Sequence, residues 1–414
     1  MSCSREASDP QAWFGRMVQN CLDYAQAGKA AGRPVVGILC EYAPRELILA
    51  AGGIPVCLCG GDADLIPAAE AHLPANLCPL IKSTYGYHLR KQNPLLEMAD
   101  LVVAETTCDG KKKMFELLAE TRPTHLLELP QKENDDDALE HWTRELRLFK
   151  AALESRFQVA ITDDRIRSAI AVMNRERALR RALAELMKVE QPPLTGRQLL
   201  GFKSLISGIP ADHEQYEAVL QLFVGRLARE PHAASCLGGQ RAEVRSQKSE
   251  VGSGESEARG LRPVRVLLTG VPLVHGAERV MDIIETHGGL VVCQENCTGL
   301  KPILEDVDIK APDPLRALAE KYYRLPCSVK TRNGARQTLL RRLAGEYRAE
   351  CVIELIWQAC HTYAIESFQI RRLAEEELDL PYLRIETDYS PSDSARIAVR
   401  VEALFEMVRS RGCS

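Results

Sequence analysis

Short apolar runs of strand length alternate with helical segments in two parts of the chain. In the first part these runs cover residues 35–40, 54–59, 101–105 and 125–130. In the second part they cover residues 264–270, 289–293, 350–360 and 381–388. Strands that alternate with helices are typical of a parallel sheet whose strands are joined by crossover helices. We therefore expect an α/β protein made of two parallel-sheet halves.

A different pattern separates the two halves. Residues 162–188 place apolar side chains at helical intervals, with Thr162 or Asp163 as the expected N-cap. Residues 232–262 hold Gly, Ser and charged residues with almost no large apolar side chain, which predicts a flexible linker. The expected divisions are an N-terminal helix with the first α/β domain over 1–133, a helical connector over 134–231, the linker over 232–262 and the second α/β domain over 263–414.

The charge of the chain is nearly balanced. Its 414 residues include 53 Lys and Arg against 57 Asp and Glu, which gives a formal net charge of −4. Because nucleic acids and anionic membranes attract clustered Lys and Arg, we expect neither as a partner. Residues 1–19 lack a basic start followed by an apolar run, and no later apolar stretch reaches about 18 residues. We therefore expect a cytoplasmic protein without a membrane anchor.

Cysteine is unusually frequent, with fourteen residues in the chain. In a reducing compartment, clustered cysteines are more often metal ligands or catalytic groups than disulfides. Cys108, Cys293 and Cys360 follow predicted strands, where the crevice of a parallel sheet and the amino ends of the next helices favour thiolates and an anionic cluster. Six cysteines stand next to turn-forming or polar residues and form the candidate ligand set: Cys78, Cys108, Cys293, Cys297, Cys327 and Cys360.

Four of the remaining cysteines fit a packing role better, because free cysteines are commonly buried small apolar residues. Among the six candidates, Cys293 and Cys297 form the one short pair, a CxxxC whose spacing can direct both sulfurs toward one site. A structural zinc site prefers paired C-x2-C spacings, so it is disfavoured, whereas an iron–sulfur cluster tolerates scattered thiolates. Four cysteines within helical or strand runs are expected to pack in the core: Cys21, Cys57, Cys59 and Cys351.

Sequence blocks in both halves carry a resemblance to a known family. In the first half they are EYAPRELILAAGGIPV (41–56), NLCPLIKSTYGY (76–87), ETTCDGKKKMFELL (105–118) and LELPQ (127–131). In the second half they are GGLVVCQENCTGLKP (288–302), LPCS (325–328), WQACHTYAIES (357–367) and LPYLRIETDYSPSD (380–393). With these blocks the chain resembles the 2-hydroxyacyl-CoA dehydratase and benzoyl-CoA reductase superfamily, and within it the double-cubane cluster proteins.

The resemblance implies a cytoplasmic, oxygen-sensitive iron–sulfur protein of anaerobic metabolism. Its fold would be two Rossmann-like (flavodoxin-like) parallel-sheet domains joined by a helical segment, in a homodimer. Its partner would be an ATP-hydrolysing [4Fe–4S] activator that delivers low-potential electrons. Its cofactor would be a double-cubane [8Fe–9S] cluster, and its activity the reduction of a small substrate. Two alternatives stay open, namely a 2-hydroxyacyl-CoA dehydratase component with a single [4Fe–4S] cluster and an electron-transfer protein without turnover.

The resemblance also implies a division of the cysteines between two cubanes. Three of them, Cys78, Cys108 and Cys360, match positions that hold one cubane in dehydratase relatives. The others, Cys293, Cys297 and Cys327, would hold the second. The chain departs from the family pattern at two positions where relatives commonly have cysteine, Val271 and Val329.

Catalytic candidates lie close to these cysteines or near strand ends. His361, next to Cys360, is expected to donate a hydrogen bond to a cluster sulfur or a proton to substrate, with a purely structural hydrogen bond as the alternative. Lys82 and Lys111 would offset the charge of the cluster, unless they are solvated helix-end residues. Glu295, like Glu105 and Glu386, is a candidate acid.

Overall fold

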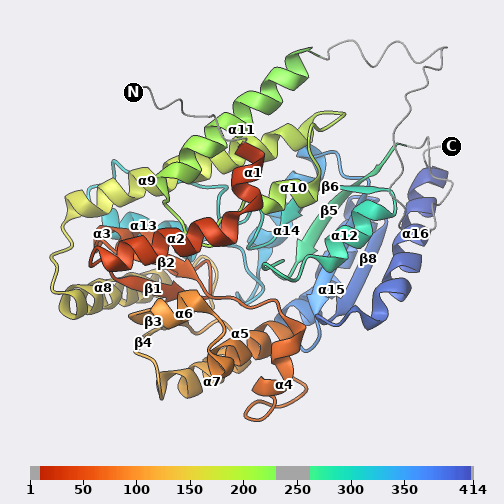
Figure 1. Cartoon of the computed structure of the whole chain (residues 1–414). Coiled ribbons are helices and arrows are strands. Elements are labelled where there is room, and N and C mark those ends of the chain that lie inside the picture. The colour runs from red at the N-terminus through yellow and green to blue at the C-terminus, as the bar shows by residue number, and fades with distance from the viewer. Residues whose placement is uncertain (1–9, 230–261, 412–414) are drawn as a thin grey trace, which may run out of the picture.

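The computed structural model describes residues 10–229 and 262–411 (Figure 1). The predicted linker lies outside the described residues except for Arg262, and so do Cys3, Cys236 and Cys413. Among the helices that are described, none combines the length and apolar composition that crossing a membrane requires.

The first domain is built around a four-stranded parallel sheet in the order β2-β1-β3-β4. Its strands are β1 (Val35–Ile38), β2 (Ile54–Cys57), β3 (Leu101–Glu105) and β4 (Thr124–Leu127). The main helices around it are α2 (Met17–Ala30), α3 (Arg45–Ala50), α5 (Pro79–Arg90), α6 (Pro94–Met98) and α7 (Asp109–Ala119), with the short α1 (Pro10–Gly15) and α4 (Ile66–Ala69). Every residue of β1 and β3 is buried, as expected for strands covered by helices on both faces.

The second domain repeats this strand order, with a parallel sheet arranged β6-β5-β7-β8. Its strands are β5 (Val264–Gly270), β6 (Gly289–Glu295), β7 (Cys351–Trp357) and β8 (Tyr382–Thr387). Its helices are α12 (Arg279–Thr286), α13 (Pro314–Tyr323), α14 (Gly334–Glu346), α15 (His361–Arg372) and α16 (Ser394–Arg411). The expected α/β fold with two parallel, Rossmann-like sheets is confirmed.

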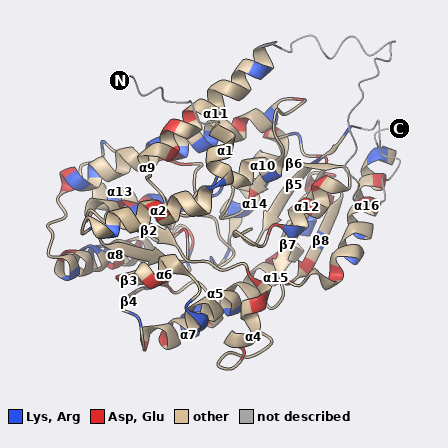
Figure 2. Ribbon diagram, viewed as in Figure 1, with Lys and Arg blue, Asp and Glu red and all other residues tan. Residues whose placement is uncertain are grey.

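Helices alone make up the regular structure described between the two sheets. They are α8 (Asp136–Phe157), α9 (Asp163–Glu185), α10 (Gly196–Gly201) and α11 (Pro210–Arg229). Thr162 caps α9, since its side chain accepts a hydrogen bond from the backbone N–H of Arg165 at 3.3 Å. Acidic and basic residues are interleaved along outer helices such as α9 and α16 (Figure 2).

The helix α13 ties the two domains together. It follows β6 in the sequence but packs against α8 and α9, and its Leu318 and Tyr322 share a buried core cluster with Trp142 of α8. The hydroxyl of Tyr322 donates to Glu46 of α3 at 2.8 Å, and Glu46 is also paired with Arg177 of α9. The two sheets therefore do not have separate cores, although each has its own strand order.

The Glu46–Arg177 pair predicts a stability difference between two neighbouring arginines of α9. Arg177→Gln leaves the buried Glu46 carboxylate without its guanidinium, so we expect a loss of about 3–5 kcal/mol in the free energy of unfolding. Arg175→Gln, which breaks an exposed pair with Glu217, should cost less than about 1 kcal/mol. Chemical denaturation followed by circular dichroism measures both, and equal losses would contradict the structural role of the buried pair.

Candidate functional site

A cavity of about 540 Å³ lies between the two domains, and residues from both line it. The strand order reverses between β1 and β3 in the first sheet and between β5 and β7 in the second. Ligands of open parallel sheets bind at such points, beyond the carboxyl ends of the strands. The cavity wall carries the residues that follow these strands, including Cys40 after β1, Cys108 after β3, Val271 after β5 and Cys360 after β7.

One glycine permits the exit of the chain from β5 toward the cavity. Gly270 has φ +106°, and a Cβ at this position would lie 2.0 Å from the carbonyl oxygen of Leu355. A side chain is therefore excluded on both backbone and steric grounds. The next residue, Val271, is buried and lines the cavity.

Thiols dominate the chemistry of the cavity. All eleven cysteines in the described residues are free, and eight of them line this one cavity. These eight come from both domains: Cys40, Cys57, Cys59, Cys78, Cys108, Cys297, Cys327 and Cys360. Such a set of soft donors is suited to metal or cluster binding.

Three of the thiols occupy equivalent places at helix starts. Cys78, Cys108 and Cys360 are the N-cap residues of α5, α7 and α15. The free N–H groups and dipole at the start of a helix favour a negative charge there. A hydrogen bond from Cys360 lowers the pKa of Cys78, and this effect is larger than the opposing effect of burial. The same bond raises the pKa of Cys360, the donor. The side chains of these two cysteines thus meet across the domain boundary.

Three further thiols form a second group. Cys40 follows β1, Cys297 follows β6, and Cys327 follows α13. Burial raises the pKa of Cys297 to about 12, and a charge on Cys327 adds to the rise. Burial likewise raises the pKa of Cys40, to which charges on Cys297 and Cys327 contribute. These mutual effects indicate that the three thiols are neighbours, and any of them that ionises on binding a ligand needs a compensating positive charge.

The remaining two thiols, Cys57 and Cys59, lie at the end of β2. Cys59 donates to the carbonyl oxygen of Leu39 at 3.0 Å. The adjacent Cys59 side chain lowers the pKa of Cys57 to about 6, with help from the Lys203 ammonium and against the effect of burial. Cys57 is therefore the most readily ionised member of this pair.

Cations compensate the charges that collect around the cavity. Lys111 and Lys203 both line it and pair with carboxylates, with Lys111 Nζ 3.2 Å from Glu105 Oε2 and Lys203 Nζ 3.0 Å from Glu41 Oε1. Burial alone would lower the pKa of Lys111, but Glu105 and the nearby thiols raise it above its usual value. Lys330, which also lines the cavity, has its pKa lowered by burial to about 8.

The structure does not bring Cys293 to this cavity. Its side chain lies within β6, is 1% exposed, and packs in a separate core cluster with Val292 and Tyr347. Burial raises its pKa well above the usual value. The expectation that both sulfurs of the CxxxC segment face one site is therefore corrected: Cys297 leaves the strand and reaches the cavity, whereas Cys293 remains in the sheet.

Two of the three expected catalytic side chains also lie elsewhere. Lys82 does not line the cavity, because its ammonium donates to Glu70 Oε1 and to the Ala75 carbonyl, both at 2.7 Å. Glu295 is fully buried and does not line the cavity, and its Oε1 lies 3.1 Å from the Lys301 ammonium. His361 does line the cavity and is exposed at the start of α15.

Three of the cavity thiols do not belong to the set predicted from the sequence. Cys40 directly follows an apolar strand, so the rule that selected Cys108 also applies to it. Cys57 and Cys59 are two residues apart at the end of a strand, a spacing that puts both side chains on one face. This position after a strand could have indicated that both thiols face the crevice. Because cysteines are often buried in cores, the sequence favoured a packing role instead.

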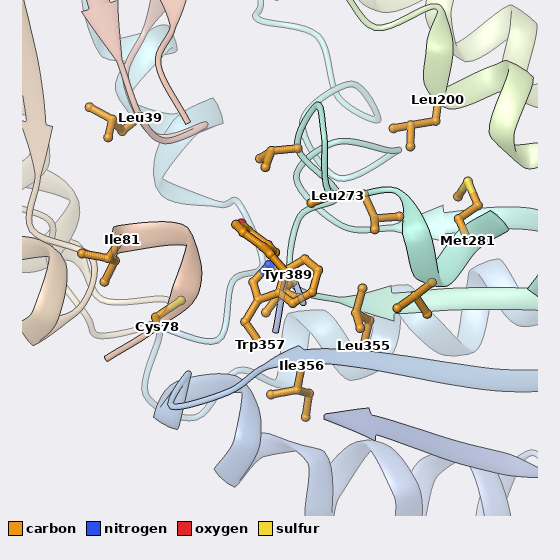
Figure 3. Close-up of a cluster of buried hydrophobic side chains, with 14 of the residues drawn as sticks. Leu39, Cys78, Ile81, Leu200, Leu273, Met281, Leu355, Ile356, Trp357 and Tyr389 are labelled. Atoms are coloured by element: carbon orange, nitrogen blue, oxygen red, sulfur yellow. The ribbon is translucent and has the colours of Figure 1, made fainter. Parts of the chain in front are cut away.

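The donor set fits an iron–sulfur cluster. The thiols are free, three of them are at helix starts, and cations also line the cavity. Figure 3 shows Cys78 of the first domain beside Trp357 and Tyr389 of the second. The two positions that depart from the family pattern, Val271 and Val329, also line the cavity, so valine side chains stand there in place of the cysteines of that pattern.

This fold and its cavity define an α/β protein with two Rossmann-like domains and a thiol-lined space between them. The profile of the 2-hydroxyglutaryl-CoA dehydratase D-component family (HGD-D) matches residues 40–408. The chain belongs to this family, and it is an enzyme of the dehydratase and reductase type.

The relatives include proteins named as dehydratases and as a reductase. The chain is 39% identical over 380 residues to the putative dehydratase subunit YjiM of Escherichia coli K12, covering 92% of this chain and 93% of that relative. It is 24% identical to the lactoyl-CoA dehydratase subunit beta of Anaerotignum propionicum, over 93% of this chain and 94% of the relative. It is also 29% identical to a benzoyl-CoA reductase subunit of Thauera aromatica, over 36% of this chain and 38% of the relative.

The hydrogen bond between Cys78 and Cys360 predicts a specific cross-link. In iron-free protein, the two-electron thiol oxidant diamide should join these two residues, because the bond holds their sulfurs together across the domain boundary. Mass spectrometry of the digested protein identifies the linked peptide. Cys78→Ser should abolish it and Cys293→Ser should leave its yield unchanged. A digest without the linked peptide would show that these thiols do not meet in solution.

Proposed function

We propose that the chain is an iron–sulfur reductase that holds a double-cubane cluster in the interdomain cavity. Cys78, Cys108 and Cys360 would bind one cubane. The second would be bound by Cys40, Cys297 and Cys327, in which Cys40 takes the place expected for Cys293. The observation that carries the proposal is the convergence of eight free thiols from both domains on one cavity.

The surroundings of the thiols support this role. When bound, the cluster would supply electron transfer at low potential. The N-cap positions of three of the thiols stabilise the thiolate form, and the ammonium groups of Lys111 and Lys203 offset the added negative charge. His361, exposed on the cavity wall, is placed to hand a proton to a substrate there.

The electrons would come from a separate protein. A D-component belongs to a two-component system, so its family implies an activator as partner. We propose that this activator is the ATP-hydrolysing [4Fe–4S] protein suggested by the resemblance. A cytoplasmic location and a homodimeric assembly belong to the same proposal.

A second candidate function is that of a 2-hydroxyacyl-CoA dehydratase component with one [4Fe–4S] cluster. The names of several relatives favour it, among them the (R)-phenyllactyl-CoA dehydratase beta subunit of Clostridium sporogenes, 21% identical over 398 residues. In that case Cys78, Cys108 and Cys360 would be sufficient as ligands. The second group of thiols, which the cavity also presents, favours the double cubane.

Iron analysis of anaerobically purified protein distinguishes the two functions. We expect two cubanes' worth of iron and acid-labile sulfide per chain, whereas one cubane's worth would support the dehydratase. Cys108→Ser and Cys40→Ser should each lower the iron content, because each removes a sulfur from one group. Cys293→Ser is the matched control and should retain all iron, since its thiol is outside the cavity. Iron loss in that control, or none in the other two, would overturn the assignment.

Two lysines test the electrostatic part of the proposal. Lys111→Gln removes a cation from the cavity wall and should make the midpoint potential of the cluster more negative, by roughly 50 mV at an effective dielectric constant of about 20. Lys82→Gln is the control, because Lys82 is bound to Glu70 outside the cavity. A redox titration followed by EPR measures both, and equal shifts would contradict the role of Lys111.

A further inference from the structure

A second cavity, of about 500 Å³, adjoins the thiol-lined one. We call it the vestibule. Five residues line both cavities and form the wall between them: Cys57, Cys59, Lys203, Val274 and Thr298. The shared wall means that a molecule in the vestibule lies next to the space assigned to the cluster.

The vestibule has the lining of a small-molecule site. Its volume lies within the range of about 300–1,000 Å³ that is usual for such sites. Much of its wall is apolar, with side chains from α1, α2, α10 and the loop after β5. The apolar residues are Phe14, Met17, Val18, Leu200, Leu205, Leu273 and Val274.

Two glycines of the vestibule lining have open space around them. Gly15 ends α1 and Gly201 ends α10. A Cβ placed on either one would have no heavy atom within 4 Å, and neither glycine needs a positive φ. Larger side chains can therefore be introduced at both positions, where they would extend into free space.

The vestibule also offers one cation without a carboxylate partner among the described residues. Arg197 pairs with Glu278 and Asp282, and Lys203 pairs with Glu41. Arg16 lines the vestibule, is exposed, and has no side-chain hydrogen bond or ion pair to any described residue. Its guanidinium is therefore available to an anionic ligand.

We propose that the vestibule binds the substrate and that this substrate is a small organic anion, whose apolar body packs against Leu205 and Leu273 and whose charged group meets Arg16. The assignment rests on the proposed function, since it is the cluster that would make the adjoining cavity a reaction site. The reacting end of the molecule would pass the shared wall at Cys57 and Cys59. The anionic group belongs either to a free carboxylate or to the coenzyme A part of a thioester.

Cys57 gives a direct measure of access to the vestibule. It is partly exposed, lies in the shared wall, and is not among the six proposed cluster ligands. The neighbouring Cys59 side chain and the Lys203 ammonium lower its pKa to about 6, which favours the thiolate near neutral pH. Alkylation at this residue can be read by mass spectrometry in protein whose iron content has been measured on the same sample.

The experiment compares an anionic and a neutral alkylating reagent on anaerobically purified, iron-loaded protein. We expect iodoacetate to be favoured relative to iodoacetamide at Cys57, after correction for their rates with a free thiol. Arg16→Gln should lower that preference about 3-fold, the effect of a single partly exposed charge. Gly201→Leu and Gly15→Leu should each slow both reagents about 10-fold, because their side chains fill the vestibule.

The matched control is Gly345→Leu, at an exposed helical glycine of α14 with equally open space around it. It should leave both alkylation rates unchanged. If Cys57 is alkylated at the same rate in this control and in both vestibule variants, the proposal is overturned. It is also overturned if Cys57 in iron-loaded protein is not alkylated at all. Iron-loaded protein with an unreactive Cys57 refutes the vestibule alone, whereas iron-free protein with the predicted alkylation refutes the proposed function alone.

Protection by ligands tests the chemical class. Benzoate should slow alkylation of Cys57, whereas benzyl alcohol, which has the same ring without the charge, should not. Benzoyl-CoA is the second probe, and stronger protection by it than by benzoate assigns the anionic group to a coenzyme A thioester. Stronger protection by benzoate assigns it to a free acid. The proposed substrate class is overturned if neither benzoate nor benzoyl-CoA slows the alkylation of Cys57, or if benzyl alcohol slows it as much as benzoate does.

Discussion

The strands of the two parallel sheets end at one shared cavity. The buried contacts of α13 hold the two domains, and therefore the two sheets, in this arrangement. This helix follows β6 but packs on α8 and α9, and Tyr322 and Arg177 both bind the buried carboxylate of Glu46. Nearby, the hydroxyl of Tyr42 donates to the carbonyl oxygen of Leu325 at 2.9 Å. Since Cys327 comes two residues after Leu325, this packing also positions one of the cavity thiols.

Burial of many sulfur atoms creates an electrostatic cost that the fold offsets locally. Cys78, Cys108 and Cys360 begin helices, where backbone N–H groups favour negative charge. The cations Lys111 and Lys203 are themselves paired with buried carboxylates, which keeps them charged and near the cavity. The arrangement supports an anionic group in the cavity while leaving His361 exposed on its wall.

The sheets and several site residues could be predicted from local patterns. Apolar runs identified the strands, and position after a strand identified Cys108 and Cys360 as residues of the crevice. The same rule applies to Cys40. It failed for Cys293 because β6 continues to Glu295, two residues beyond the predicted end of the strand. Lys82 was misjudged for another reason: its partner Glu70 lies outside the helix that carries Lys82, and no local pattern reveals that pairing.

The sequence by itself determined the strand and helix pattern, the family, and the number of thiols at strand and helix ends, because these depend on residues that are near in the chain. Only the tertiary structure decided which thiols meet, because the cavity is formed by loops from two domains that α13 ties together. It likewise decided that Cys57 and Cys59 separate two cavities. Residues of α1, α10 and the loop after β5, far apart in sequence, complete the vestibule only when the chain is folded.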